Sequence, residues 1–162
     1  METLELPQMI ATQFEPKKAY QWLMSIDGID SYTFETAQRP NMTVEEIPMA
    51  YINTIRYIAG RYVPQTMTIA LKDPIAPSAA QKVMGWLRLC YEAETGRAGY
   101  AVMYKKDISL KMLDGMGNVV EKWSIKGAWF TSINFGELSY ETGNTPAKIA
   151  CVMRWDMATL EY

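Results

Sequence analysis

Two segments in the last third of the chain carry bulky apolar side chains at every second position. In the first, which opens the stretch Val119–Leu138, these are Val119, Trp123 and Ile125. Alternation with a period of two places one set of side chains on one face of a β-strand and the other set on the opposite face. Both segments therefore predict strands with one buried face, separated by a reversal of the chain. The second segment carries Ile149, Cys151, Met153, Trp155 and Met157.

The same period of two recurs in earlier parts of the chain. Met67, Ile69 and Leu71 alternate with polar neighbours. Stretches that contain glycine, such as Asp27-Gly28 and residues 114–118, separate the runs and predict turns. We expect each of these two turns to close a hairpin. The predicted strands cover residues 17–25, 32–37, 51–58, 65–71, 106–113 and 119–126, in addition to the last segment.

This series of strands predicts a mainly β fold, an antiparallel β-sandwich or barrel of about eight strands. One flanking α-helix is expected at residues 78–94, because Ser78 and Gln81 have the spacing of a capping box and Thr95-Gly96 is a typical helix end. At 162 residues the chain has the usual size of a single domain, 1–162. The apolar stripe of the helix is expected to contain Ala80, Val83, Met84, Leu87 and Tyr91.

Residues 40–50 differ from the strands around them. Pro40 cannot donate a hydrogen bond to a strand ladder, and Pro48 restricts pairing near the other end. Two adjacent acids, Glu45 and Glu46, lie between these prolines. The sequence therefore predicts an extended loop that leaves the body of the domain. Residues 1–14 alternate only weakly and are interpreted as an N-terminal arm that docks onto the rest.

Composition argues against catalysis, metal binding and strong nucleic-acid binding. The formal net charge is −2 without basic runs, and histidine, the commonest general base, is absent. Cys90 and Cys151 lack a metal-ligand spacing and are interpreted as reduced core thiols. We expect no enzyme activity, no cofactor and no metal. No apolar run reaches the length of a membrane span, so we expect a chain made in a cytoplasm without a membrane anchor.

The chain contains 5 Trp, 10 Tyr and 12 Met. A platform that stacks sugars or nucleic-acid bases is one interpretation of the aromatic residues. Their positions beside aliphatic residues along predicted strands favour packing in a core or an interface. The predicted edge strands also carry little of the charge or proline that natural monomers use to block sheet edges. We therefore expect copies of the chain to continue one another's sheets.

Several pieces, in this order and spacing, resemble the tail tube proteins of contractile-tailed phages (myoviruses). The resemblance runs from about Lys17 onward and does not include the N-terminal arm. The last of the pieces is followed by a Tyr-Glu-Thr-x-Asn strand end at residues 140–144. The pieces are Ala37-Gln38-Arg39-Pro40, Val44–Pro48 with Tyr51-Ile52-Asn53, Ala59-Gly60-Arg61, Met67–Leu71 before the helix, and Ile125–Phe130 with Gly136-Glu137-Leu138.

The resemblance implies a β-barrel with a flanking helix, six copies of which form a ring, and rings that stack into a tube inside a contractile sheath. It implies the sheath, tape-measure, baseplate and terminator proteins as partners, DNA that passes through the lumen without specific binding, and a place in the virion. The loop at 40–50 would then reach a neighbouring subunit or ring through Val44, Glu45, Glu46, Ile47, Pro48 and Tyr51. The candidates for lumen-facing residues are Thr33, Glu35, Thr66 and Thr68.

Two other functions fit the same pattern. The tube of a phage-derived injection machine, such as a tailocin or a type VI secretion needle, would use the same fold and the same contacts between copies. A monomeric β-barrel that carries a small ligand would also have about eight strands and a helix. Such a carrier would have a closed apolar interior and would stay monomeric at high concentration.

Overall fold

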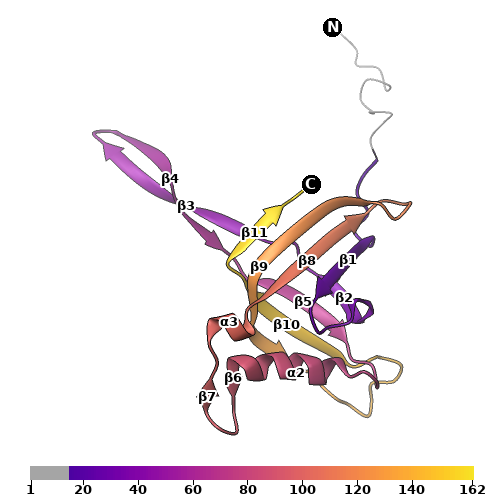
Figure 1. The fold of residues 1–162 in the computed structure, drawn as a ribbon. Helices are drawn as coiled ribbons and strands as arrows, with labels where there is room; N and C mark the ends of the chain where they lie inside the picture. The colour runs from indigo at the N-terminus through magenta and orange to yellow at the C-terminus, as the bar shows by residue number, and fades with distance from the viewer. Residues whose placement is uncertain (1–14) are drawn as a thin grey trace.

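The computed structural model describes residues 15–162, so the predicted arm at 1–14 lies outside the described residues. As predicted, the fold is mainly β, the paired strands are antiparallel, and there is one main helix (Figure 1). The strands are β1 (Trp22–Ile26), β2 (Phe34–Ala37), β3 (Met42–Tyr51), β4 (Thr54–Pro64), β5 (Met67–Lys72), β6 (Tyr91–Glu92), β7 (Arg97–Ala98), β8 (Lys106–Leu113), β9 (Val119–Asn134), β10 (Lys148–Arg154) and β11 (Met157–Leu160). The helices are η1 (Ser31–Thr33), α2 (Ala79–Cys90) and α3 (Ala101–Tyr104).

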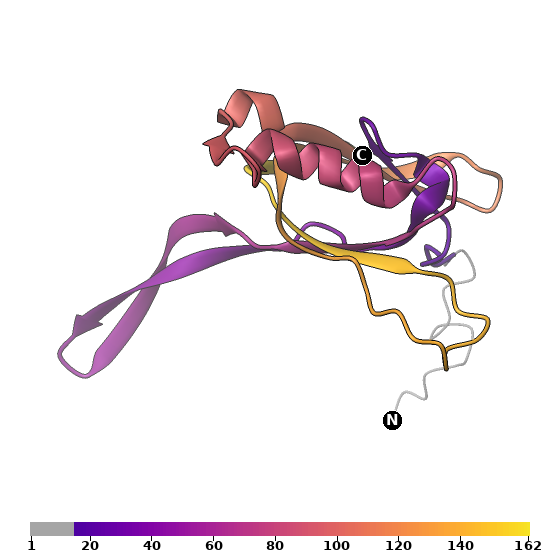
Figure 2. The ribbon, with the colours of Figure 1, turned by 90° about the horizontal axis from the view of Figure 1, so that it is seen from below.

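The main sheet has seven strands in the order β1-β8-β9-β10-β5-β2, and β11 also pairs with β9. The N-terminal part of β9 pairs with β8 and β11, and its C-terminal part pairs with β10. The sheet therefore divides at β9 into half A (β1, β8, β11 and the start of β9) and half B (β2, β5, β10 and the end of β9). Together with α2, the two halves enclose the core, as the views in Figures 1 and 2 show.

Gly127 lies where β9 passes from half A to half B. Its φ is +70°, and a Cβ at this position would lie 2.2 Å from the carboxylate of Asp156. Only glycine fits such a conformation and such a close approach. The amide of Asp156 donates to the carbonyl of Lys126 at 3.0 Å, at the point where the chain leaves β10 for β11. The corner between the two halves is thus fixed by two neighbouring bends.

The buried residues confirm the alternation expected from the sequence. Met67, Ile69 and Leu71 are each 0% exposed, and the apolar residues of β8 and β10 also point inward. Met157 is the exception in the last segment, being 49% exposed, because β11 begins there after the bend. The core comprises Met24, Ile26, Ile29, Met67, Ile69, Leu71, Ala79, Val83, Trp86, Ile108, Leu110, Ile125, Ala128, Phe130, Ile149, Cys151, Met153 and Trp155.

Helix α2 lies across one end of the two sheet halves (Figure 1). Its start agrees with the capping prediction, since the hydroxyl of Ser78 accepts from the amide of Gln81. Its end at Cys90 is earlier than predicted, because the following residues form the β6–β7 hairpin. The apolar stripe was predicted on the wrong side of the helix in part. The buried side chains are Ala79, Val83 and Trp86, whereas Met84 is exposed.

The predicted N-terminal hairpin is wrong. β1 begins only at Trp22 and pairs with β8, whereas β2 pairs with β5 on the far side of the sheet order. The short helix η1 turns the chain between them. Apolar alternation located both strands, but it carries no information about which strand lies beside which, and a turn with glycine at position 28 does not by itself specify a hairpin.

The predicted loop at 40–50 is also wrong in form. Residues 42–51 are strand β3, which pairs with β4 in a long hairpin that projects from the body of the protein (Figures 1 and 2). The strand predicted at 51–58 is displaced, since Ile52 and Asn53 form the turn of the hairpin and β4 runs from Thr54 to Pro64. Pro48 fits this strand because β3 pairs on one side with β4 and has solvent on the other.

Candidate assembly interface

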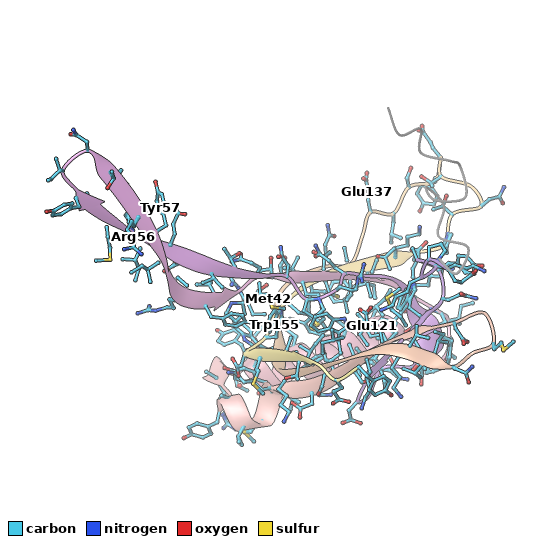
Figure 3. All side chains as sticks on the ribbon, turned by 90° about the horizontal axis from the view of Figure 1, so that it is seen from above. Met42, Arg56, Tyr57, Glu121, Glu137 and Trp155 are labelled. Carbon is cyan, nitrogen blue, oxygen red and sulfur yellow. The ribbon has the colours of Figure 1, made fainter. Side chains whose placement is uncertain are left out.

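The β3–β4 hairpin is a two-stranded ribbon without cover from the rest of the described chain. All ten residues of β3 are exposed, and eight of the eleven in β4 are exposed as well. Figure 3 shows side chains such as Arg56 and Tyr57 on the ribbon, away from the body of the protein. A hairpin of this kind is marginally stable in water when nothing packs on it.

The hairpin exposes ten large apolar side chains. Monomeric soluble proteins rarely expose an apolar surface of this extent, and such surfaces mark sites where other proteins bind. The residues occur on both faces of the ribbon, so a partner that covered one face would leave the other exposed. The ten are Met42, Val44, Ile47, Met49, Tyr51, Ile52, Ile55, Tyr57, Ile58 and Tyr62.

Every residue predicted for contact between subunits lies on this hairpin. Val44, Glu45, Glu46, Ile47, Pro48 and Tyr51 are all exposed residues of β3, and the side chain of Tyr51 is 74% exposed. The prediction did not include β4, whose Ile55, Tyr57, Ile58 and Tyr62 contribute as much apolar surface. The signal was present in the sequence, because apolar residues at both odd and even positions are typical of a strand without a distinct inner face.

A buried carboxylate lies behind the link that leads into the hairpin. Glu121 of β9 is 5% exposed, and its Oε1 accepts from Nε1 of Trp123 at 2.6 Å. Its other partners are Lys17 and Arg39, which come from the segment before β1 and from the link between β2 and β3. Burial acts to raise the pKa of Glu121, but the hydrogen bonds from Lys17 and Trp123 and the nearby cations outweigh it, so the pKa lies below its usual value.

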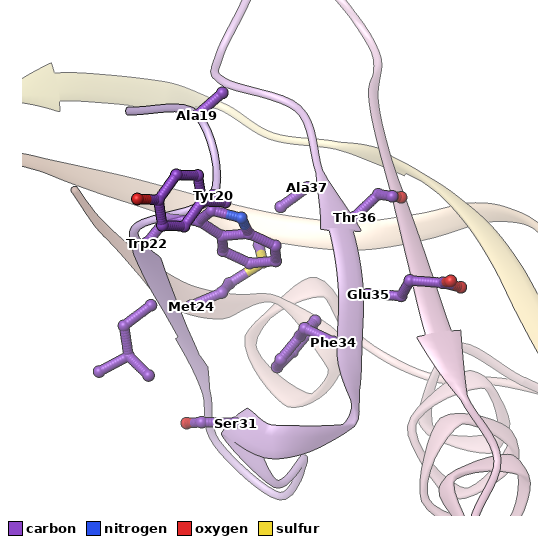
Figure 4. Close-up of a pocket in the computed structure, with 10 residues that line it drawn as sticks. Ala19, Tyr20, Trp22, Met24, Ser31, Phe34, Glu35, Thr36 and Ala37 are labelled. Atoms are coloured by element: carbon purple, nitrogen blue, oxygen red, sulfur yellow. The ribbon is translucent and has the colours of Figure 1, made fainter. Parts of the chain in front are cut away.

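Over residues 15–162, β1, β2 and β11 are edge strands of the main sheet, and the edges of β1 and β2 face the same opening. Within the described residues β1 pairs only with β8 and β2 only with β5, so the barrel is open between them. The opening holds a depression of about 560 Å³, which we call the edge slot, and the rings of Trp22 and Phe34 lie in it between the two strands (Figure 4). Its lining combines the polar residues Ser31, Glu35 and Thr36 with the apolar residues Ala19, Tyr20, Trp22, Leu23, Met24, Phe34 and Ala37.

Three of the four predicted lumen-facing residues lie on or beside the outward face of half B. Thr66 and Thr68 are exposed and flank the buried Met67. Glu35 is half-buried and pairs with Lys148 of β10 at 2.8 Å. The prediction that Thr33 faces the lumen is wrong. Thr33 belongs to η1, is 3% exposed, and its hydroxyl donates to the carbonyl of Asp30 at 2.7 Å. Thr33 was selected from the alternation of a strand predicted at 32–37, but residues 31–33 form a helical turn and β2 begins only at Phe34.

The outward face of half B carries more cations than anions. Lys72, Lys148 and Arg154 are exposed and alternate with buried neighbours, whereas Glu35 is the acid that pairs with Lys148 on this face. The weakly negative charge of the whole chain therefore does not describe this surface. Between the charges lie Thr68, Ser132, Asn134 and Ala150, which are small or polar, and the half-buried Val152.

The described residues offer little to a metal or a reactive-thiol function. Burial raises the pKa of the Cys151 thiol to about 12, which keeps it protonated at neutral pH, and Cys90 is half-buried. Within residues 15–162 no group of three or more His, Cys, Asp or Glu side chains is placed to hold a metal ion. Over the same range, no helix combines the length and apolar character that a membrane crossing requires.

No protein-family model matches the chain, and no curated protein matches its sequence. Among solved structures, a chain of the tube-terminating cap of the anti-feeding prophage is similar, with a TM-score of 0.74 and 18% identity over 94% of each chain. A chain of the PVC sheath-tube complex, from an extracellular contractile injection system, has a TM-score of 0.68 and 16% identity over 98% of this chain and 99% of that chain. Hcp1 from Flavobacterium johnsoniae has a TM-score of 0.50 and 11% identity over 88% of this chain and 95% of that one.

These similarities extend over most of the chain. They are similarities of structure, because the sequence identities are low. They confirm the mainly β fold with one main helix and the likeness to phage-type tubes, whereas the myovirus family itself stays a prediction. The chain has the fold seen in tube and tube-terminating assemblies of contractile injection systems.

Proposed function

We propose that this protein is a structural subunit of the inner tube of a contractile, phage-like particle. The observation that carries the proposal is the uncovered apolar β3–β4 hairpin on a fold shared with tube assemblies. A surface of ten exposed apolar side chains needs a partner, and a tube of identical copies supplies one at fixed stoichiometry. The role is structural, so the protein works through its contacts and not through a reaction.

Rings of six copies, stacked into a tube, are the form of assembly we propose. The hairpin and the free edges of β1 and β2 are different surfaces, so a contact between them is head-to-tail and closes into a ring or continues as a stack. The hairpin residues Val44–Pro48 and Tyr51 reach the neighbouring subunit or ring. Sheath, baseplate and terminator proteins are the proposed partners outside the ring, and the tape-measure protein is the proposed partner inside it.

The outward face of half B is the proposed wall of the bore. Thr66, Thr68 and Glu35 would line it together with small polar residues that offer a passing molecule few apolar contacts. In a phage tail the bore would conduct DNA into the host, and the protein would belong to the virion. Lys72, Lys148 and Arg154 would then attract phosphates, and their spacing along the wall would decide how freely DNA slides.

An injection machine is the second candidate particle, and its support is the likeness to chains of extracellular contractile injection systems and to Hcp1. Its bore would carry protein. A further candidate is a terminator that caps the tube, since the higher of the two injection-system TM-scores belongs to a tube-terminating cap. A terminator would form single rings, whereas a tube subunit would form stacks of rings.

Negative-stain electron microscopy of the purified protein tests the proposal. Hollow stacks of rings would support a tube subunit, and single rings would support a terminator. A matched variant replaces residues 43–63 by Asn-Gly, which is feasible because Met42 and Pro64 are direct partners at the base of the hairpin. We expect this variant to keep a cooperative unfolding transition of the body and to form no stacks. A wild-type protein that stays monomeric at high concentration and binds lipid would overturn the proposal in favour of a ligand carrier.

A further inference from the structure

The tip of the β3–β4 hairpin has an unusual residue in its turn. Tyr51 and Thr54 are paired, so Ile52 and Asn53 form a two-residue turn. Ile52 has a φ of +50°, which lies in the left-handed region. Turns of this length that require a positive φ generally have glycine, asparagine or aspartate there, because a β-branched side chain crowds the backbone.

Ile52 has no packing against the rest of the described chain that would offset this strain. Its side chain is 84% exposed, and its neighbours Tyr51 and Ile55 are 74% and 57% exposed. Backbone strain at an exposed position is typical of sites that bind something. A large apolar side chain at the tip of a projecting ribbon is also well placed to enter a depression on another molecule.

The edge slot is a suitable acceptor, and it lies on the other side of the molecule. Figures 1 and 2 show the hairpin projecting from one side, with β1 and β2 at the opposite side. The hairpin therefore cannot reach the slot of its own chain. Apolar side chains line the slot together with the polar Ser31, Glu35 and Thr36. Tyr20 and Leu23 at its rim are 74% and 42% exposed, so within the described residues the slot too lacks cover.

From these observations we infer that Ile52 anchors the hairpin tip of one copy in the edge slot of a second copy. The inference rests on the proposed function and specifies the contact that joins the copies. Burial of Ile52 between Trp22 and Phe34 would remove apolar surface of both partners from water. The unpaired backbone groups of β1 and β2 would also be within reach of the polar groups of the turn. A second copy is the occupant because the same chain carries both surfaces on opposite sides, and residues 15–162 cover neither of them.

The first test compares Ile52→Gly with Ile75→Gly. Ile75 is fully exposed in the loop before α2 and has no positive φ, so it is a matched control for the loss of an exposed isoleucine. Below the assembly threshold, Ile52→Gly should slow hydrogen exchange of the hairpin amides by about fivefold, because the strain is relieved. It should raise the critical concentration for assembly at least tenfold, because the anchor is lost. The control should change neither quantity.

These outcomes separate the inference from the proposed function. Wild-type protein that forms neither rings nor tubes would overturn both. Tubes that form with Ile52→Gly at the wild-type threshold, or an equal loss with Ile75→Gly, would overturn the inference alone. Opposite changes in hairpin stability and in assembly are the expected signature, since a residue with a purely structural role in the hairpin would move both in the same direction.

The second test identifies the acceptor. Ile52→Cys and Tyr20→Cys are prepared separately in a Cys90→Ser background, mixed, and treated with a short thiol–thiol cross-linker. The remaining thiol, Cys151, is buried. We expect a cross-linked pair that contains one copy of each variant. Met116→Cys replaces Tyr20→Cys as the control, because Met116 is 91% exposed in the β8–β9 loop and is not part of the slot. Cross-linking to position 116 but not to position 20, or to an unrelated partner protein only, would overturn the slot as acceptor.

Discussion

At the scale of the residue, Glu121 shows how one side chain connects distant parts of the chain. Its carboxylate binds Lys17, Arg39 and Trp123, so it joins the segment before β1, the link into the hairpin and β9. The sequence did not reveal it, because Glu121 occupies an inward position in the alternation between Val119 and Trp123, where a charged residue is rare. The partners that make its burial tolerable come from far along the chain, and no local pattern indicates them.

Glu121 should also make the stability of the monomer depend on pH. Its folded pKa lies below the usual glutamate value of 4.5, so its contribution to stability is present above about pH 4.5 and is lost as the pH falls through the folded pKa. Glu121→Gln should lower the free energy of unfolding by about 1–3 kcal/mol at pH 7, since Lys17 and Arg39 lose their partner. The difference between the two proteins should shrink at pH 3.5 in urea unfolding.

Glu137→Gln is the control for this experiment, because Glu137 is exposed in the loop before β10 (Figure 3). It should change the unfolding free energy by less than about 0.5 kcal/mol at both pH values. A loss for Glu121→Gln that is the same at pH 7 and pH 3.5 would show that the carboxylate acts through shape rather than through charge.

At the scale of the element, prediction from the sequence was most accurate where one face of a strand is buried. Strands β5, β8 and β10 follow their predicted alternation because half of each contacts the core. Residues 40–50 of the β3–β4 hairpin were predicted as a loop because they have no core contact and therefore no alternation, whereas residues 51–58 were predicted as a strand. For α2 the position was right but the stripe was not, because Trp86 was left out of it although it is the largest buried side chain of the helix.

Trp86 is expected to hold α2 onto the sheet. Its ring lies 4.3 Å from that of Phe130, and its Nε1 donates to the carbonyl of Tyr104 at 2.6 Å. Trp86→Ala should lower the unfolding free energy by about 3–5 kcal/mol, because it removes a large buried side chain. Met84→Ala, on the exposed side of the same helix, should change it by less than about 1 kcal/mol. Chemical denaturation of both variants measures this, and similar losses for the two would mean that the predicted stripe was right.

At the scale of the whole molecule, some features of the candidate interface could be predicted from the sequence and others could not. Open edges and contact through residues 44–51 were predicted from the lack of edge protection and from the resemblance to tail tubes. The location of the edges at β1 and β2 was not, because it depends on the order of strands in the sheet. The cationic face of half B was not predicted either, since Lys72 and Lys148 come together only when β5 and β10 pair.

Assembly driven by the exposed apolar hairpin should be insensitive to salt. Charge pairs across a contact weaken as the Debye length falls below about 10 Å, whereas apolar burial does not. Raising NaCl from 0.1 to 0.5 M should therefore leave the assembly threshold unchanged or lower it, as sedimentation velocity would show. A threshold that rises tenfold with salt would mean that charges such as Glu45, Glu46 and Arg56 hold the copies together.

The placement of the hairpin and the open sheet edge on opposite sides has a consequence for any series of copies. If copies join as proposed, each added copy would cover one of these surfaces and present the other, so the series would have a direction and its two ends would differ chemically. A protein that starts the series needs to match one surface, and a protein that stops it needs to match the other. The proteins that start and stop the series would then be distinguished by the end surface that they bind, and this does not depend on the number of copies added.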